Sequence, residues 1–223
     1  FNFVLQSTFM NEKEQSLQQL RDIKMMMERS SRFISLSGLS GVFAGVFALI
    51  GAAVFYMYLN TQMASGYYSI AERLPMDVSM DYLTFGILDA AVILFLSIGF
   101  GIFFTTRKAK RDGLNIWDRK VGHLLINLSI PLIAGGLFCL ILLSYGLFGL
   151  VAPCTLLFYG LALLNASKYT LDEIKWLGIS EIALGLIGCI YLGYGMTIWC
   201  IGFGVLHIVY GAFMYFRYEH KQQ

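Results

Sequence analysis

The sequence predicts an all-α fold: a polytopic membrane bundle of six transmembrane helices, arranged as three hairpins with both termini in the cytoplasm. Three observations predict this fold. Apolar residues make up 57% of the 223 residues and charged residues only 13%, whereas about a quarter of the residues in a soluble domain are charged. Six apolar segments are long enough to cross about 30 Å of hydrocarbon as helices. The basic residues also lie almost entirely on one side of the predicted membrane.

The elements follow in chain order. Residues 1–31 are predicted to be a cytoplasmic segment, in which residues 10–31 form a helix with one apolar face. A six-helix transmembrane domain, residues 32–217, comes next, and residues 218–223 form a cytoplasmic tail. The six spans are residues 33–58, 82–106, 121–145, 147–165, 174–195 and 197–217. The last four spans are so closely spaced that short turns must join them, whereas residues 60–81 form a longer outer loop.

The basic residues predict the orientation. Fifteen of the sixteen Lys and Arg residues fall in the N-terminal segment, the tail and the loops after the second and fourth spans, and only Arg73 falls on the other side. Basic loops mark the cytoplasmic side of membrane proteins. We therefore expect a multi-pass protein of the bacterial inner (cytoplasmic) membrane. Its expected partner is the lipid bilayer, because loop 107–120 is basic but no groove-sized patch for nucleic acid exists.

Two glycine-spaced segments share one pattern. GLSGVFAGVFA, from Gly38, and GISEIALGLIG, from Gly178, both contain G-[LI]-S-x-[VI]-x-x-G. Helices in lipid associate through small residues that let their backbones approach closely. The predicted packing residues are Ser37, Gly41, Gly45, Gly178, Gly185 and Gly188. The packing either holds one chain together or forms a homodimer face.

The spans also end alike. Phe100-Gly101, Tyr159-Gly160 and Tyr210-Gly211 precede the three cytoplasmic exits. Such likeness is expected from internal duplication, which builds several transport folds, and equally from ordinary bundle packing.

The third hairpin, ISEIALGLIGCIYLGYGMTIWCIGFGVLHIVYGAFMYFRYE, resembles the repeat unit of the bacterial acid-resistance membrane protein family. That family has three such hairpins with glycine-rich helices and minimal loops, so the resemblance implies the same architecture here. Residues 60–81 depart from it, because they are longer than its outer loops. The opening MMMERSSRFISLSGLSGVFAG resembles uncharacterised six-span bacterial proteins. Neither resemblance supplies catalytic residues.

Three ionisable residues lie well inside the spans, away from their ends, and matter most for function: Asp89, Glu181 and His207. A charge at the bilayer centre costs about 2.5–3.5 kcal/mol, so such residues face the bundle interior or water. A helix rise of about 1.5 Å per residue places further polar residues at or near the depth of Glu181. They are Ser40, Ser97, Asn127 and Ser129. We expect these side chains to converge on a polar pocket in which Glu181 lies beside a residue of the third span.

This pocket either satisfies its own polar groups or binds a proton, a cation or a small polar ligand. Catalysis is not expected, because the sequence lacks the common hydrolase and phosphate-binding motifs. The four cysteines have no metal-ligand spacing, so neither a metal site nor a cofactor is predicted.

Two function classes remain. One is a small proton- or cation-linked transporter that uses the intramembrane polar residues. The other is a non-transporting regulatory or structural membrane subunit. It would act through its glycine-rich helix faces and through residues 10–31, which would contact a second copy or a cytoplasmic protein.

Overall fold

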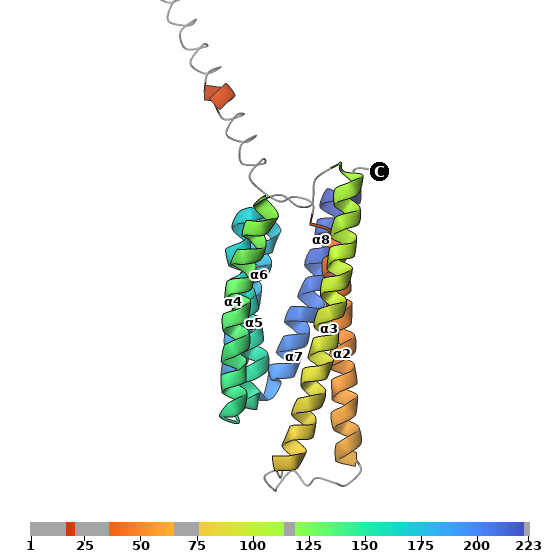
Figure 1. Ribbon diagram of the computed structural model, residues 1–223, viewed down its shortest axis with the longest axis vertical. Coiled ribbons are helices and arrows are strands. Elements are labelled where there is room, and N and C mark those ends of the chain that lie inside the picture. Colours follow the sequence, from red (N-terminus) through yellow and green to blue (C-terminus); the bar gives the residue numbers. More distant parts are fainter. Residues whose placement is uncertain (1–16, 21–35, 65–75, 114–118, 221–223) are drawn as a thin grey trace, which may run out of the picture.

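The computed structural model describes residues 17–20, 36–64, 76–113 and 119–220, and every regular element in these ranges is helical (Figure 1). The helices are α2 (Gly38–Ala64), α3 (Met76–Arg111), α4 (Arg119–Ser144), α5 (Phe148–Ala166), α6 (Asp172–Ile190), α7 (Gly195–Trp199) and α8 (His207–Tyr218). A π-helical segment, η3 (Cys200–Leu206), joins α7 to α8. The all-α prediction is therefore confirmed, and each predicted span overlaps a helix. The predicted helix 10–31 lies outside the described residues, except for helical residues 17–20.

Five helical stretches are long and apolar enough to cross a membrane. They are Gly38–Asn60, Leu83–Arg111, Val121–Ser144, Phe148–Tyr169 and Leu192–Tyr218. Helix α6 overlaps the remaining predicted span but is not one of the five, because its 19 residues include Glu173, Lys175 and Glu181. The structure thus shows several helices that could span a membrane, while six crossings remain a prediction.

The turn between α4 and α5 explains how so short a connection reverses the chain. Gly146 has a φ of +71°, in the left-handed region that glycine adopts without a steric penalty. Its N–H donates to the Leu143 carbonyl at 3.0 Å, and the N–H of Leu147 donates to the Leu142 carbonyl at 2.9 Å. These two bonds form a Schellman motif, which satisfies the last carbonyls of α4.

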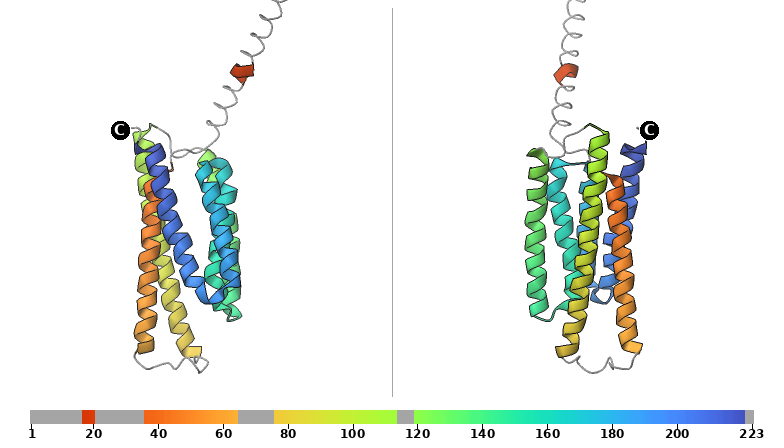
Figure 2. Two further views of the ribbon diagram at one scale, coloured as in Figure 1. Left: turned by 180° about the vertical axis from the view of Figure 1, so that it is seen from behind. Right: turned by 45° about the vertical axis from the view of Figure 1, so that its right-hand side comes forward.

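The long helices form two groups that run side by side. Helices α4, α5 and α6 make one group, and α2, α3 and α8 make the other (Figures 1 and 2). Within the groups, α5 packs against both α4 and α6, and α2 packs against both α3 and α8. The apolar stretch Leu192–Tyr218, which contains α7, η3 and α8 and is called the last span below, connects the groups. Its α7 contacts α5 and α6, whereas η3 and α8 lie along α2.

Glycines bring α2 and the last span into backbone contact. A Cβ atom on Gly211 would lie 2.7 Å from the Gly38 carbonyl oxygen, and one on Gly38 would meet the Gly211 carbonyl in return. One turn further, a Cβ on Gly41 would lie 3.2 Å from the Gly211 Cα. A Cβ on Gly45 would lie 2.5 Å from the Gly204 carbonyl oxygen. A Cβ at Gly38, Gly45 or Gly211 would therefore overlap the backbone of the partner helix, whereas one at Gly41 would need its neighbours to give way by a few tenths of an ångström.

The α5–α6 pair repeats this arrangement. A Cβ on Gly160 would lie 2.6 Å from the Gly178 carbonyl oxygen, and one on Gly178 would lie 2.8 Å from the Gly160 carbonyl oxygen. Further along, a Cβ on Gly185 would lie 2.9 Å from the Pro153 carbonyl oxygen. The predicted packing glycines of both segments therefore make contacts within one chain. In each pair, the helix with the shared glycine pattern packs against a helix that contains one of the Tyr-Gly dipeptides, Tyr210-Gly211 in α8 or Tyr159-Gly160 in α5.

The outer helices are less buried. Helix α3 packs against α2 through aromatic rings, with Phe43 stacked on Phe104 at 4.9 Å and on Phe100 at 5.4 Å between ring centroids. Much of its apolar surface is exposed, including Phe95 and Ile102. In a membrane this surface faces lipid, which requires no protein partner.

Candidate functional site

The most unusual polar group in the described chain lies where α5, α6 and the last span meet. Glu181 of α6 has an exposed fraction of 0% and His207, the first residue of α8, an exposed fraction of 6%. Tyr159 reaches the same point from α5. These three residues, which we call the Glu181 cluster, come from both helix groups.

Both carboxyl oxygens of Glu181 are buried and have no hydrogen-bond partner among the described residues. His207 comes within ion-pair distance, with its Nδ1 3.4 Å from the Glu181 Oε1, but the contact is an ion pair only when the ring is protonated. A buried polar group without a partner is rare and costly, and the cost is larger for a charge in a membrane interior. The Glu181 carboxyl group can therefore gain a hydrogen bond or a proton without breaking an existing hydrogen bond of its own.

His207 makes two hydrogen bonds that fix its ring. Its Nε2 lies 2.8 Å from the Tyr159 hydroxyl, and its Nδ1 lies 3.1 Å from the Gly202 carbonyl oxygen. Both bonds are satisfied if Nδ1 carries the hydrogen and Nε2 accepts from tyrosine, an assignment that follows from the partners. Nδ1–H then lies between two acceptors, the Gly202 carbonyl and the Glu181 carboxylate.

The repeated helix pairs explain why Glu181 occupies this position. Glu181 stands three residues after Gly178, where the first segment has Gly41 three residues after Gly38. Gly41 lies against the His207 backbone, since its Cβ would be 3.4 Å from the His207 carbonyl oxygen. The His207 backbone thus contacts α2, whereas its side chain contacts the α5–α6 pair.

Gly202 in the π-helical segment makes room for the carboxyl group. A Cβ on Gly202 would lie 2.5 Å from both the Glu181 Oε2 and the Leu156 Cδ2. Single π-helical turns occur often at functional sites. Here the widened turn of η3 presents the Gly202 carbonyl to the His207 ring.

The other predicted polar residues do not join Glu181. Asn127 donates to the His123 carbonyl of its own helix at 2.8 Å, and Ser40 donates to the Ser37 carbonyl at 2.5 Å. The prediction that Glu181 lies beside Asn127 or Ser129 is wrong. Helix α5 packs between α4 and α6, so α4 residues at the same depth do not reach the carboxyl group.

Asp89 and Ser97 also lie elsewhere. Asp89 is on α3 against α2, with its Oδ2 3.3 Å from the position of a Cβ on Gly51. Ser97, on the same helix, is partly buried. The predicted four-span pocket is therefore replaced by the three-residue Glu181 cluster.

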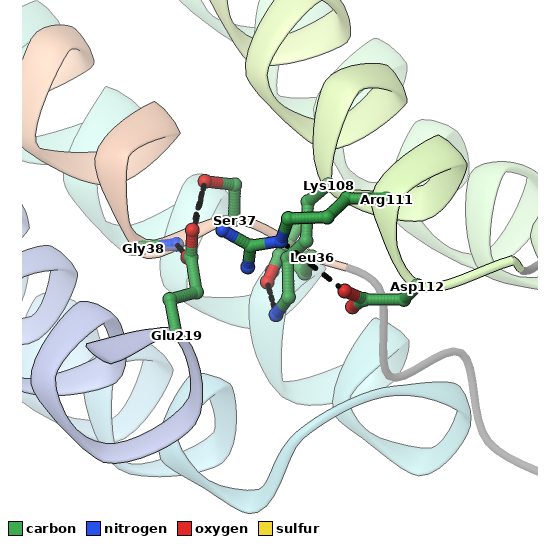
Figure 3. Close-up of polar contacts among 7 residues, drawn as sticks. All are labelled: Leu36, Ser37, Gly38, Lys108, Arg111, Asp112 and Glu219. Atoms are coloured by element: carbon green, nitrogen blue, oxygen red, sulfur yellow. Dashed lines mark hydrogen bonds and ion pairs between the residues drawn. The ribbon is translucent and has the colours of Figure 1, made fainter. Parts of the chain in front are cut away.

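A second buried cluster lies at the basic end of the helices and includes Glu219, which belongs to the predicted cytoplasmic tail, residues 218–223. Glu219 has an exposed fraction of 4% and accepts from the Gly38 N–H at 2.7 Å and from the Ser37 hydroxyl at 3.1 Å (Figure 3). It thereby satisfies a free N–H at the start of α2. The Lys108 ammonium donates to the Leu36 carbonyl at 2.9 Å. The ends of α2, α3 and α8 are joined here.

A third polar contact ties α6 to α8 near the same end. Glu173 accepts from the Tyr218 hydroxyl at 2.9 Å and pairs with the Arg217 guanidinium at 3.1 Å. Polar contacts thus link the two helix groups along α8 at two places, near the helix ends through Glu173 and within the bundle through the Glu181 cluster.

Among the residues that the structure describes, no three His, Cys, Asp or Glu side chains are positioned to hold a metal ion. The four cysteines are free thiols, and two of them, Cys139 and Cys154, belong to a small apolar cluster. The chemistry that the Glu181 cluster offers is therefore that of a carboxyl, an imidazole and a phenol, which hold and exchange protons. In comparisons with known proteins, no family model, no curated protein and no solved structure matches this chain.

Proposed function

We propose that this chain is a six-span membrane protein with both ends on the cytoplasmic side, and that it is a small proton-linked transporter whose proton site is the Glu181 cluster. The observation that carries the proposal is the buried Glu181 carboxyl group, neither of whose oxygens has a hydrogen-bond partner in the part of the chain that the structure describes. A proton bound there removes a charge that the membrane interior strongly disfavours.

The sixth crossing in this proposal is α6. It packs along α5, which is one of the helices apolar enough to cross a membrane. Its acidic residues Asp172 and Glu173 stand in the first turn, where carboxylates favour a helix N-terminus. Lys108, Lys168 and Arg217 lie in or beside the helix ends on this same side, which supports a cytoplasmic assignment.

The location of the cluster supports coupling between proton binding and movement. His207 belongs to α8, which lies along α2, whereas Glu181 and Tyr159 belong to the α5–α6 pair. Each pair is held by glycine contacts that leave little freedom, so a relative movement of the two groups would occur at their mutual contact. Transporters built from repeated units bind ligands at such contacts.

The geometry suggests how a proton acts. When Glu181 is ionised, its carboxylate attracts the Nδ1–H of His207 away from the Gly202 carbonyl, which lies only 0.3 Å closer (3.1 Å against 3.4 Å). When Glu181 takes up a proton, that attraction weakens and the bond to Gly202 holds. The π-helical segment thus gains or loses one side-chain hydrogen bond with each proton.

Proteoliposomes on a solid-supported membrane test this function without knowledge of the substrate. A pH jump should give a transient current from proton binding in the parent protein. Glu181→Gln should abolish the current, whereas Asp89→Asn, which removes another intramembrane carboxyl group, should retain it. A Glu181→Gln variant with an unchanged current would contradict the proposal.

One observation favours the alternative, a non-transporting structural or regulatory subunit. Glu181 is fully buried, and Leu156 and Gly202 close around it. In that case the parent protein gives no current in the pH jump. Glu181→Gln is then neutral or stabilising, because a neutral amide costs less to bury than a carboxylate.

A further inference from the structure

An open groove of about 510 Å³ lies on the outer face of α3, toward its basic end. It is lined by Gly99, Ile102, Phe103, Thr106, Arg107 and Lys110. These residues are spaced three or four apart, so they share one face of the helix. Among the described helices α3 packs mainly against α2, and the described residues that line the groove all belong to α3.

The cations in the groove differ from the other basic residues of the same helix end. Lys108 is buried and bonds to the Leu36 carbonyl (Figure 3), and Arg111 pairs with Asp112 at 3.4 Å. Arg107 and Lys110 are exposed and have no hydrogen bond or ion pair with the described residues. Of the four basic residues at this end of α3, the two without a partner among the described residues are the two that line the groove.

The rest of the groove is apolar. Ile102 and Phe103 have exposed fractions of 63% and 58%. Gly99 lies deeper, about 12 Å along the helix from Arg107 at about 1.5 Å per residue, and a Cβ there would meet nothing within 4 Å. The missing side chain leaves a notch below the cations, bordered by two large apolar residues.

We propose that this groove is a binding site for one anionic phospholipid. The phosphate group lies between Arg107 and Lys110, and an acyl chain follows Ile102 and Phe103 into the notch at Gly99. Two uncompensated cations favour an anionic head group over a zwitterionic one, whose cationic part they repel. The apolar part gives a lipid an advantage over free phosphate, because only a lipid has a chain to bury there.

Native mass spectrometry in neutral detergent tests the site with phosphatidylglycerol and phosphatidylcholine as competing probes. The parent protein should retain phosphatidylglycerol in preference. The double variant Arg107→Gln/Lys110→Gln should bind phosphatidylglycerol about 30-fold more weakly, the effect of removing two basic side chains from an anionic surface. The matched control, Lys168→Gln/Lys175→Gln, removes the same charge from the same end and should leave binding unchanged.

A second pair of variants tests whether the notch at Gly99 binds an acyl chain. Gly99→Leu fills the groove and should weaken phosphatidylglycerol binding, whereas Gly101→Leu, at another open glycine of α3, should not. Glycerol phosphate, which has the head group without chains, should fail to displace the lipid. Equal losses in the two charge variants, normal binding by Gly99→Leu, or displacement by glycerol phosphate would each overturn the proposal. This site and the Glu181 cluster stand on different residues, so either can fail without the other.

Discussion

Gly45→Ala tests the glycine contact that joins α2 to the last span. The new methyl carbon would lie 2.5 Å from the Gly204 carbonyl oxygen, 2.8 Å from the Ile208 Cγ1 and 3.0 Å from the Ile208 nitrogen. Carbon atoms pack best at about 3.5–4.0 Å. Two of the three neighbours are backbone atoms, which cannot move without shifting the helix.

The loss in free energy of unfolding caused by Gly45→Ala follows from these short distances. If the helices move apart by about 0.5–1 Å, each affected atom pair loses a quarter to a half of its dispersion energy. Overpacking of this kind costs about 1–3 kcal/mol, and we expect the upper half of that range because backbone is displaced. Gly136→Ala is the matched control, since nothing lies within 4 Å of its Cβ.

Equilibrium unfolding in mixed micelles, driven by an increasing fraction of dodecyl sulfate, measures the difference in free energy of unfolding. Gly136→Ala should be neutral or stabilising, because alanine favours a helix more than glycine does. If Gly45→Ala unfolds with the same midpoint as Gly136→Ala, the close contact between α2 and the last span does not exist as described.

Two further predictions concern the helix ends. Glu219→Ala should lower the free energy of unfolding by about 1.5–3 kcal/mol, because the Gly38 N–H and the Ser37 hydroxyl lose a charged acceptor; Glu219→Gln, whose amide oxygen still accepts, should lose less. An alanine variant as stable as the parent would show that Glu219 does not hold the start of α2. In a variant with its four native cysteines replaced by alanine, Lys168→Cys and Tyr194→Cys should react with an impermeant maleimide from opposite sides of the membrane. Labelling of both from one side would refute the six-span arrangement.

The long helices could be predicted from the sequence because apolar length alone requires them in lipid. The repeated glycine pattern also pointed to close packing, and in the structure Gly45 and Gly178 lie at backbone contacts. The pattern did not predict which helix each glycine segment packs against. The contact of Gly38 with Gly211 joins residues from opposite ends of the bundle sequence, and no local signal specifies that pairing.

The neighbours of Glu181 could not be predicted for a related reason. Counting residues from a helix end gives depth but not direction around the bundle. Asn127 was selected for its depth, yet α5 packs between its helix and α6. His207 and Glu181 were both identified as intramembrane residues, but their contact depends on how the last span crosses between the two groups. Tyr159 was noted only as part of a repeated exit.

Glu219 was missed because a charged residue after the last span usually lies in water. Its burial comes from the neighbouring start of α2, where Gly38 needs an acceptor for its N–H. The charge pattern at the end of α3 was likewise recognised as basic. Only the structure separates Lys108, which bonds within the chain, from Arg107 and Lys110, which do not.

The central claim is that Glu181 takes up and releases a proton inside the bundle, and infrared difference spectroscopy of the protein in lipid measures this most directly. A pH change should produce a carbonyl-stretch band of a protonated carboxyl group. The band should vanish in Glu181→Gln and persist in Asp89→Asn. A difference spectrum without any Glu181-dependent carboxyl band, across the whole pH range in which the protein stays folded, would contradict the account.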